Sequence, residues 1–446
     1  MPTRTNQRSL VMPAFVVILA AILTFGASPS RAEDRFGDST WVAPVPEPSG
    51  APEDPGPRVA EPDHERTWET VLRTPFRVAF FPFRLMGWGL EGAADLAEKH
   101  LPVDELNAPH QPPHGFHAAP QASISSNEGL GLGLSLKSAL GGPHNVARSD
   151  LIWSTKDTRR ARATFLFGEN RPLGASLFGM YRHRPNRRFY GIGNDAGTTR
   201  TIFLEREDEF AGSVLVTQKP RLHARAFVGL SDIDIGPGYN DSPRSIEVFT
   251  PAEVPYLTRG SRVWYAGAGA GWASLNEPYD PARGVQIFGE ARHVMDADAN
   301  DLTYEAYRIE GRGYLPVFAD RRILAGRAVL DGVNPASGSG PIPFYRLPYS
   351  NGDDRFSGYS GDRFRDKRLV IVQAEYRWLI WSKLWAFALA QRAAVAPSTG
   401  ALRWASMHEA YGGGFRYRIT DTQTARLELA KGNQGFDIDL NLEAPF

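Results

Sequence analysis

The sequence contains no cysteine, and this absence excludes a disulfide framework, thiolate metal ligands and a cysteine nucleophile. An excess of one charge sign is also missing, because 50 Lys and Arg residues balance 50 Asp and Glu residues over 446 positions. Without a basic footprint, we expect no nucleic-acid partner. Beyond the first thirty-odd residues, no apolar run is long enough to cross a bilayer as a helix. These absences argue against a helical membrane protein.

The chain begins with the features of an export signal. Arg4 and Arg8 supply a positively charged start, residues 10–27 are apolar, and Ser30-Arg31-Ala32 offers a cleavage site between small residues. We interpret residues 1–32 as a signal peptide, with a single transmembrane anchor as the alternative. The sequence therefore predicts a protein that leaves the cytoplasm.

Two further segments precede a long region of different character. Residues 33–63 are rich in Pro, Glu and Asp and are predicted to be a disordered linker, because this composition buries too little apolar surface. Residues 64–117 are predicted to be a short helical periplasmic segment followed by a second linker. Arg73, Arg77 and Arg84 lie among aromatic residues there, which is typical of a helix at a membrane interface. Packing against a barrel mouth, or plugging it, is the alternative.

From residue 118 to residue 446 the hydrophobic period becomes two, as in β-strands. In the last segment, one face is apolar and the other carries Asp437, Asp439 and Glu443. The same alternation of apolar and charged faces recurs in several earlier segments. A strand with one lipid-facing and one lumen-facing side produces this pattern. Residues 118–446 are therefore predicted to form an all-β transmembrane domain, an antiparallel outer-membrane β-barrel.

The strand count depends on how the segments are divided. Single-chain bacterial barrels have even numbers of strands, so sixteen is preferred over seventeen. Either the first candidate is a lead-in, or the two candidates between residues 200 and 218 are one strand, and the choice decides on which side of the membrane residues 185–199 lie. The long connections 232–261 and 332–367 are expected to be extracellular loops. The candidates are 119–125, 129–139, 146–155, 159–167, 174–184, 200–207, 209–218, 221–231, 262–274, 284–295, 303–314, 321–331, 368–379, 384–396, 409–419, 424–431 and 436–445.

Several landmarks resemble the BamA/TamA-type superfamily of outer-membrane assembly and translocation barrels, the bacterial surface antigen family. The resemblance covers roughly residues 118–446. Its turn motif comprises Phe189, Tyr190, Gly191, Gly193 and Asn194, and its loop motif comprises Ser357, Gly358, Tyr359, Arg363, Arg365 and Asp366. It implies that the long loop folds inward into the barrel. It also implies that the terminal Phe446 is the signal by which the barrel assembly machinery inserts the chain.

Two departures from the family pattern change what the resemblance implies. The family's loop carries an arginine where this chain has Ser357, and its partner strand carries an aspartate where this chain has Leu389. The usual Arg–Asp lock is thus expected to be missing as a unit, which avoids leaving one buried charge alone. We hypothesise that Arg363 or Arg365 anchors the loop instead. The expected lumen partners are the carboxylates of Glu290, Glu310 and Glu375.

The second departure is that residues 33–117 show no POTRA domain, the client-handling unit of this superfamily. The resemblance still implies outer-membrane protein assembly, translocation or lipid handling, with a passive channel or structural barrel as the alternative. A barrel-embedded enzyme is disfavoured, since nothing marks Ser406 or His408 as activated. The expected partners are outer-membrane lipids, lipopolysaccharide and envelope or client proteins, and no cofactor or metal is predicted.

Overall fold

Strands dominate the computed structural model of the protein. It describes residues 116–125, 129–142, 144–168, 171–218, 221–240, 242–277, 280–298, 302–317, 321–350, 356–381, 383–420 and 423–441, all within one of the chain's two compact units. The predicted signal peptide, linker and helical segment with Arg73, Arg77 and Arg84 lie outside the described residues, apart from Phe116 and His117. Phe446 lies outside them too.

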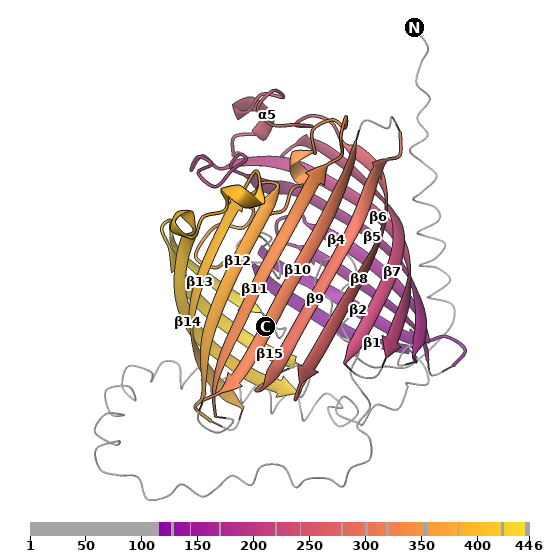
Figure 1. Cartoon of the computed structure of the whole chain (residues 1–446), viewed down its shortest axis with the longest axis vertical. Coiled ribbons are helices and arrows are strands. Elements are labelled where there is room, and N and C mark those ends of the chain that lie inside the picture. Colours follow the sequence, from indigo (N-terminus) through magenta and orange to yellow (C-terminus); the bar gives the residue numbers. More distant parts are fainter. Residues whose placement is uncertain are drawn as a thin grey trace, which may run out of the picture. The chain divides into compact units, whose positions relative to one another are not determined.

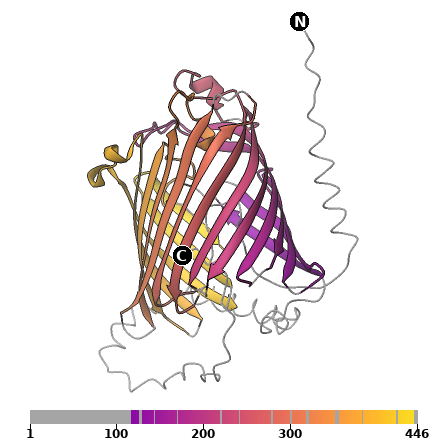
Figure 2. The same ribbon diagram turned by 45° about the vertical axis from the view of Figure 1, so that its right-hand side comes forward.

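The described residues form one antiparallel sheet, so the predicted all-β class is confirmed. Every strand pairs with its neighbours in sequence, and the order closes because β1 also pairs with β16 (Figures 1 and 2). The strands are β1 (Phe116–Ser125), β2 (Gly129–Ala139), β3 (Asn145–Ser154), β4 (Arg159–Phe167), β5 (Leu173–Phe189), β6 (Thr201–Gln218), β7 (Leu222–Pro237), β8 (Ser261–Leu275), β9 (Gly284–Asp296), β10 (Thr303–Pro316), β11 (Arg322–Pro335), β12 (Arg368–Leu379), β13 (Leu384–Ala396), β14 (His408–Thr420), β15 (Gln423–Gly432) and β16 (Gly435–Asn441).

The two candidate segments between residues 200 and 218 are one strand, β6, and the candidate that begins at residue 119 is the strand β1. β5 extends to Phe189 and so includes residues 185–189. The connection that follows β5 lies at the same end of the barrel as the other long connections. Successive antiparallel strands alternate in direction, so the connections after odd-numbered strands share this end. The opposite end carries only short connections among the described residues.

The connections at the long-loop end contain the few helical turns. They are the helix α5 (Ser245–Val248) and the 3-10 turns η1 (Phe344–Arg346), η3 (Thr399–Ala401) and η4 (Trp404–Ser406). In Figure 1, α5 stands above the sheet at this end. No helix among the described residues is long and apolar enough to span a membrane.

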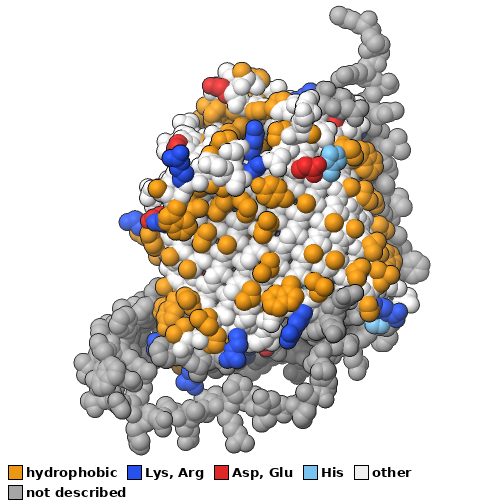
Figure 3. All heavy atoms as spheres, in the orientation of Figure 1, with side chains coloured by type: hydrophobic (Ala, Val, Ile, Leu, Met, Phe, Trp, Pro, Cys, Tyr) orange, Lys and Arg blue, Asp and Glu red, His pale blue; other side chains and the backbone are white. Residues whose placement is uncertain are grey.

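The barrel wall is apolar outside and charged inside, the reverse of a soluble protein. Trp153, Leu173 and Phe436 are all at least 64% exposed on the outer face. The lumenal face buries charged side chains, with Glu375 and Arg377 fully inaccessible. Figure 3 shows hydrophobic side chains spread over the outer wall and charged ones gathered toward its ends. Alternation along each strand produces the two faces, as the sequence period predicts.

Candidate functional site: the inward loop and the charged lumen

The connection between β11 and β12, of which residues 336–350 and 356–367 are described, folds into the long-loop end of the lumen. Phe344 in η1 is completely buried, and its ring packs against Phe189 at 4.7 Å and Phe203 at 5.0 Å between centroids. Farther along, Phe356 stacks on Tyr359 at 4.7 Å, with an interplanar angle of 12°. Burial of these large aromatic surfaces stabilises the folded loop. The loop thus turns inward, as the resemblance implies.

The predicted turn motif receives the loop. Gly191 and Gly193 adopt positive φ angles of 104° and 108°. The amide of Gly193 donates to the carbonyl oxygen of Arg365 at 2.9 Å. Tyr190 is buried, and the guanidinium of Arg363 lies 5.0 Å from the centre of its ring. The turn and the loop, more than 150 residues apart in sequence, therefore form one structure.

Asn194 extends this structure across the lumen to β13 and β14. Its side-chain oxygen accepts from the amide of Val395 at 3.1 Å, and its side-chain nitrogen donates to the carbonyl oxygen of Ser406 at 2.8 Å. Its own carbonyl oxygen lies 3.0 Å from Nε2 of His408, whose ring stacks on Phe364. Ser406 and His408 are thus used in structural contacts to other groups.

The loop tip rests on the last strands of the barrel. The amide of Ser357 donates to Oε1 of Gln391 on β13 at 3.3 Å, and the hydroxyl of Tyr359 donates to the carbonyl oxygen of Glu409 at 3.1 Å. Gly358 has a φ of 78°, and a Cβ there would lie 2.6 Å from the backbone nitrogen of Gly432. Only glycine meets both conditions without strain.

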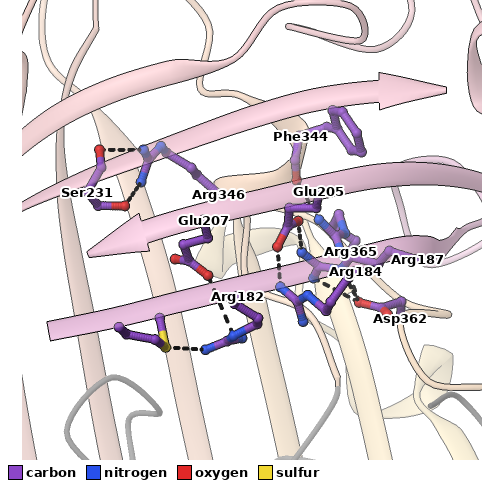
Figure 4. A network of polar contacts seen from close by, with 11 residues as sticks. Arg182, Arg184, Arg187, Glu205, Glu207, Ser231, Phe344, Arg346, Asp362 and Arg365 are labelled. Carbon is purple, nitrogen blue, oxygen red and sulfur yellow. Dashed lines mark hydrogen bonds and ion pairs between the residues drawn. The ribbon is translucent and has the colours of Figure 1, made fainter. Parts of the chain in front are cut away.

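An ion-pair network anchors the loop, although not in the predicted form. Oδ1 of Asp362 accepts from Nη2 of Arg187 at 2.9 Å and from Nη2 of Arg365 at 3.0 Å. Arg187 also pairs with Glu205 on β6, which in turn pairs with Arg184 on β5 (Figure 4). The hypothesis that a loop arginine binds a wall carboxylate is therefore wrong. The ion pair has the opposite arrangement, because the loop supplies the carboxylate and the wall supplies the arginine.

Arg365 and Arg363 have other roles than the one predicted for them. Arg365 is fully buried and donates to the carbonyl oxygen of Phe344 at 3.0 Å. Burial lowers the pKa of its guanidinium to about 10, and the positive charge of Arg187 acts in the same direction. The negative charge of Asp362 raises the pKa of Arg365 but offsets only part of this lowering. Arg363 donates to the carbonyl oxygen of Ala196 at 2.7 Å.

Asp366 lies at the base of the loop. Its Oδ1 accepts from the amide of Lys367 at 2.7 Å. Burial raises the pKa of this carboxyl, and the hydrogen bond from Lys367 opposes the shift. The contact is local, so Asp366 does not join the loop to the barrel wall.

The three carboxylates expected to receive the loop arginines pair within the wall. Glu290 pairs with Arg225. Glu310 accepts from Arg308 and Arg312 at 2.6 Å and from Arg327 at 2.8 Å. Glu375 pairs with Arg377 and accepts from Arg426 at 2.7 Å. All three face the lumen, as predicted, but their partners are arginines of the wall. Arg308, Arg312 and Arg377 lie on the same strand as the carboxylate they pair with, and Arg327 lies on the adjacent strand. Arg225 and Arg426 reach their carboxylates from two and three strands away.

Below the loop the lumen contains a polar cavity of about 300 Å³. Its lining includes Arg182, Glu207, Tyr265 and Arg292 from the wall and Arg346 from the loop. Arg346 donates to the carbonyl oxygen of Ser261 and to its hydroxyl at 2.9 and 2.7 Å. Within the described part of the chain, no group of three or more His, Asp or Glu residues is placed to hold a metal ion.

Sequence reasoning missed Asp362, Arg187 and Glu205, the residues that hold the loop. A signal was present, because β5 carries four arginines after Tyr181 and β6 carries Glu205, Glu207 and Glu209. Opposite charges on consecutive strands predict cross-strand pairs. The register needed to name the partners comes from the structure, which places Arg184 opposite Glu205.

Two solved barrel structures are similar to the described fold. BamA from Haemophilus ducreyi, lacking POTRA domains 1–3, matches with a TM-score of 0.55 and 11% identity, over 73% of this chain and 68% of that chain. CdiB from Escherichia coli matches with a TM-score of 0.50 and 10% identity, over 76% of this chain and 62% of that chain. The resemblance to BamA-type barrels is thus confirmed at the level of the fold. No protein-family model and no curated protein sequence matches the chain.

Proposed function

We propose that the protein is a sixteen-stranded barrel of the outer membrane that handles unfolded protein or lipid at the seam between β1 and β16. The apolar outer wall and charged lumen support a bilayer location, and the fold shared with BamA and CdiB supports the role. The outer-membrane location is inferred from the same features, with residues 1–32 as the export signal.

The observation that carries this proposal is the pairing at the seam. β1 pairs with β2 along its whole length, from Phe116 opposite Ser138 to Ser125 opposite Gly129. At the other edge of β1, the one pair recorded among the described residues is Ile124 opposite Leu440. Backbone donors and acceptors that a seam leaves without a partner strand can pair with an added strand, which is how edge strands recruit partners.

The direction of the last strand supports one orientation of the barrel in the membrane. β16 runs toward the end with short connections, so that end would face the periplasm and the long loops would face outward. In this orientation, the lipids and lipopolysaccharide of the outer leaflet would contact the outer wall near the long loops. The barrel assembly machinery would act on the chain during its own insertion, and client or envelope proteins would approach from the periplasm.

A disulfide across the seam tests the proposal. The chain has no cysteine, so Ile124→Cys with Leu440→Cys creates the single possible bond. Cα atoms of paired antiparallel residues lie about 4.5–5.5 Å apart, within disulfide range. The matched control joins β15 to β16 through Leu429→Cys and Ile438→Cys.

Proteoliposomes would be assayed for insertion of an unfolded barrel protein and for movement of fluorescent phospholipid between leaflets. We expect oxidation of the seam pair to abolish one of these activities and a reductant to restore it, while the control pair stays active. Equal activity of the oxidised seam and control proteins would show that opening of the seam is not needed for insertion or for lipid movement.

A passive channel is the second candidate, and the polar cavity of about 300 Å³ favours it. Steady single-channel conductance in planar bilayers, with no insertion or lipid movement in proteoliposomes, would support that role. The protein is proposed not to be an enzyme.

A further inference from the structure

Arg292 on β9 projects into the lumenal cavity. Side chains alternate along a strand, and Arg292 shares its face with Glu290, which also lines the cavity. The side chain of Arg292 is exposed to the lumen. Within the described part of the chain, its guanidinium forms no hydrogen bond and no ion pair, and its recorded contact is the ring of Tyr265, whose centre is 5.6 Å away.

Two carboxylates of the cavity attract Arg292 without pairing with it. Glu290 pairs instead with Arg225, which reaches it from β7. Glu209 on β6 accepts from the hydroxyl of Tyr265 at 2.5 Å. Both carboxylates are thus engaged by other side chains, and the donors of Arg292 remain directed to the cavity.

Glycines of β8 fix the position of these side chains. Gly267 lies between Phe227 on β7 and Arg292 on β9 in the register of the sheet. A Cβ at Gly267 would lie 2.5 Å from the ring of Phe227 and 2.8 Å from Cβ of Arg292. Gly269 lies in the same way between Arg225 and Glu290. Glycine therefore lets the neighbouring side chains lie against β8, at the wall of the cavity.

The lining of the cavity carries more positive than negative charge. Seven arginines and five carboxylates line it, which is a surplus of two positive charges. Arg346 of the inward loop is the other arginine without a carboxylate partner, since it donates to oxygen atoms of Ser231 and Ser261 (Figure 4). Low-dielectric walls focus the field of such a surplus, so the cavity favours an anion.

The other groups of the cavity set a second requirement. Glu207 and Glu209 line it together with the hydroxyl-bearing rings of Tyr265 and Tyr304. A bare oxyanion such as phosphate would lie against these carboxylates and be repelled. Hydroxyl groups, in contrast, donate to carboxylates and accept from arginine and tyrosine. A ligand with one acidic group and several hydroxyl groups therefore matches the whole lining.

We propose that this cavity binds a hydroxylated organic acid of monosaccharide size, with its carboxylate on Arg292. A guanidinium holds a carboxylate through two parallel hydrogen bonds, and packing on an aromatic ring leaves its N–H edge free to do so. The volume of about 300 Å³ is at the lower end of the range for small-molecule sites. The site is separate from the seam between β1 and β16.

Arg312 shows how a lumenal arginine that stabilises the barrel is held. It lies on β10, outside the lining of the cavity, and donates to Glu310 at 2.6 Å. Heat-modifiable migration on gels reports barrel unfolding. We expect Arg312→Gln to lower the temperature of the gel shift, because it breaks an ion pair, and Arg292→Gln to leave that temperature unchanged.

Ligand-detected nuclear magnetic resonance measures weak binding to the full chain in detergent micelles, through transfer of saturation from protein to ligand. Galacturonate is a suitable probe. Galactose has the same ring with a neutral CH2OH group in place of the carboxylate, and acetate has the carboxylate without the hydroxyl groups. We expect galacturonate to bind and the other two molecules to bind at least tenfold more weakly.

Variants of the same arginine test its role. Arg292→Gln should weaken binding of galacturonate at least tenfold, whereas Arg312→Gln, the matched control, should stay within twofold of the unchanged protein. Arg292→Lys keeps the charge but loses the paired hydrogen bonds, so we expect an intermediate affinity. Added salt should weaken binding by screening the charges. If Arg292→Gln fails to fold, Arg292→Lys carries the test.

Four results would overturn the proposal. One is no saturation transfer to galacturonate from the folded protein. Another is equal weakening by Arg292→Gln and Arg312→Gln, which would indicate a general effect of lumenal charge. Binding of acetate as tight as that of galacturonate would indicate a simple anion site, and equally tight binding of galactose would show that Arg292 does not select the acid. None of these measurements involves the seam, so their outcome is independent of the proposed function.

Discussion

Asp362→Asn is the most informative single change, because it removes the negative charge of the side chain that anchors the loop and changes almost nothing else. Oδ1 of this carboxylate accepts from Nη2 and Nε of Arg187 at 2.9 and 3.2 Å and from Arg365 at 3.0 Å, and its side chain is 5% exposed. Removing one partner of a buried ion pair costs about 3–5 kcal/mol. Arg187 keeps Glu205 and Arg365 keeps a backbone carbonyl, so we expect the lower end of that range.

A loss of about 3 kcal/mol corresponds to a roughly hundredfold larger population of the undocked loop. Amide hydrogen exchange measures this population, because exchange of a protected amide tracks its local opening. The amide of Gly193, bonded to Arg365, and that of Asp362, bonded to Ser350, should exchange about a hundred times faster. Amides in the middle of β12 should be unaffected.

Asp366→Asn is the matched control for this experiment. It removes the same charge from the same loop, but the amide oxygen of Asn can still accept the bond from Lys367. Its loop amides should exchange at nearly the unchanged rate. If Asp362→Asn also leaves the exchange rates within threefold, the network centred on Asp362 does not hold the loop.

Three further changes probe the loop tip and the barrel wall. Gly358→Ala should undock the tip and speed exchange of loop amides, because the new Cβ meets the backbone of β15, while Gly338→Ala has the same positive φ but open space and should have a much smaller effect. Tyr359→Phe should destabilise the docked tip by about 1–3 kcal/mol, because the hydroxyl donates to the carbonyl oxygen of Glu409 and accepts from the amide of Asn433, and a larger loss would mean that the ring stacking also changes. Glu375→Gln should lower the temperature of the gel shift that reports unfolding, since it leaves buried Arg426 with one carboxylate fewer, and an unchanged temperature would contradict this role.

The strand pattern was readable from the sequence because it depends on local alternation. The apolar face of the last segment was predicted to face lipid, and Phe436 on that face is 70% exposed. The same alternation appears in β7, where Leu222 is 45% exposed and its neighbour His223 is fully buried. The antiparallel class was predictable for the same reason, whereas the inward loop was implied by the resemblance to the BamA/TamA-type barrels. Division of residues 200–218 was ambiguous, because alternation continues through β6 without a turn residue that would mark a break.

By itself, the sequence determined which side chains face the lumen, but not which of them meet. Glu375 and Asp362 are equally plausible partners for a loop arginine when only composition and period are known. Which carboxylate takes part in anchoring the loop depends on the strand register and on the path of the loop, which returns to β5 some 175 residues earlier in the chain. Hydrogen bonds and buried ion pairs act over about 3 Å, so only the tertiary structure decided that Asp362 anchors the loop on Arg187.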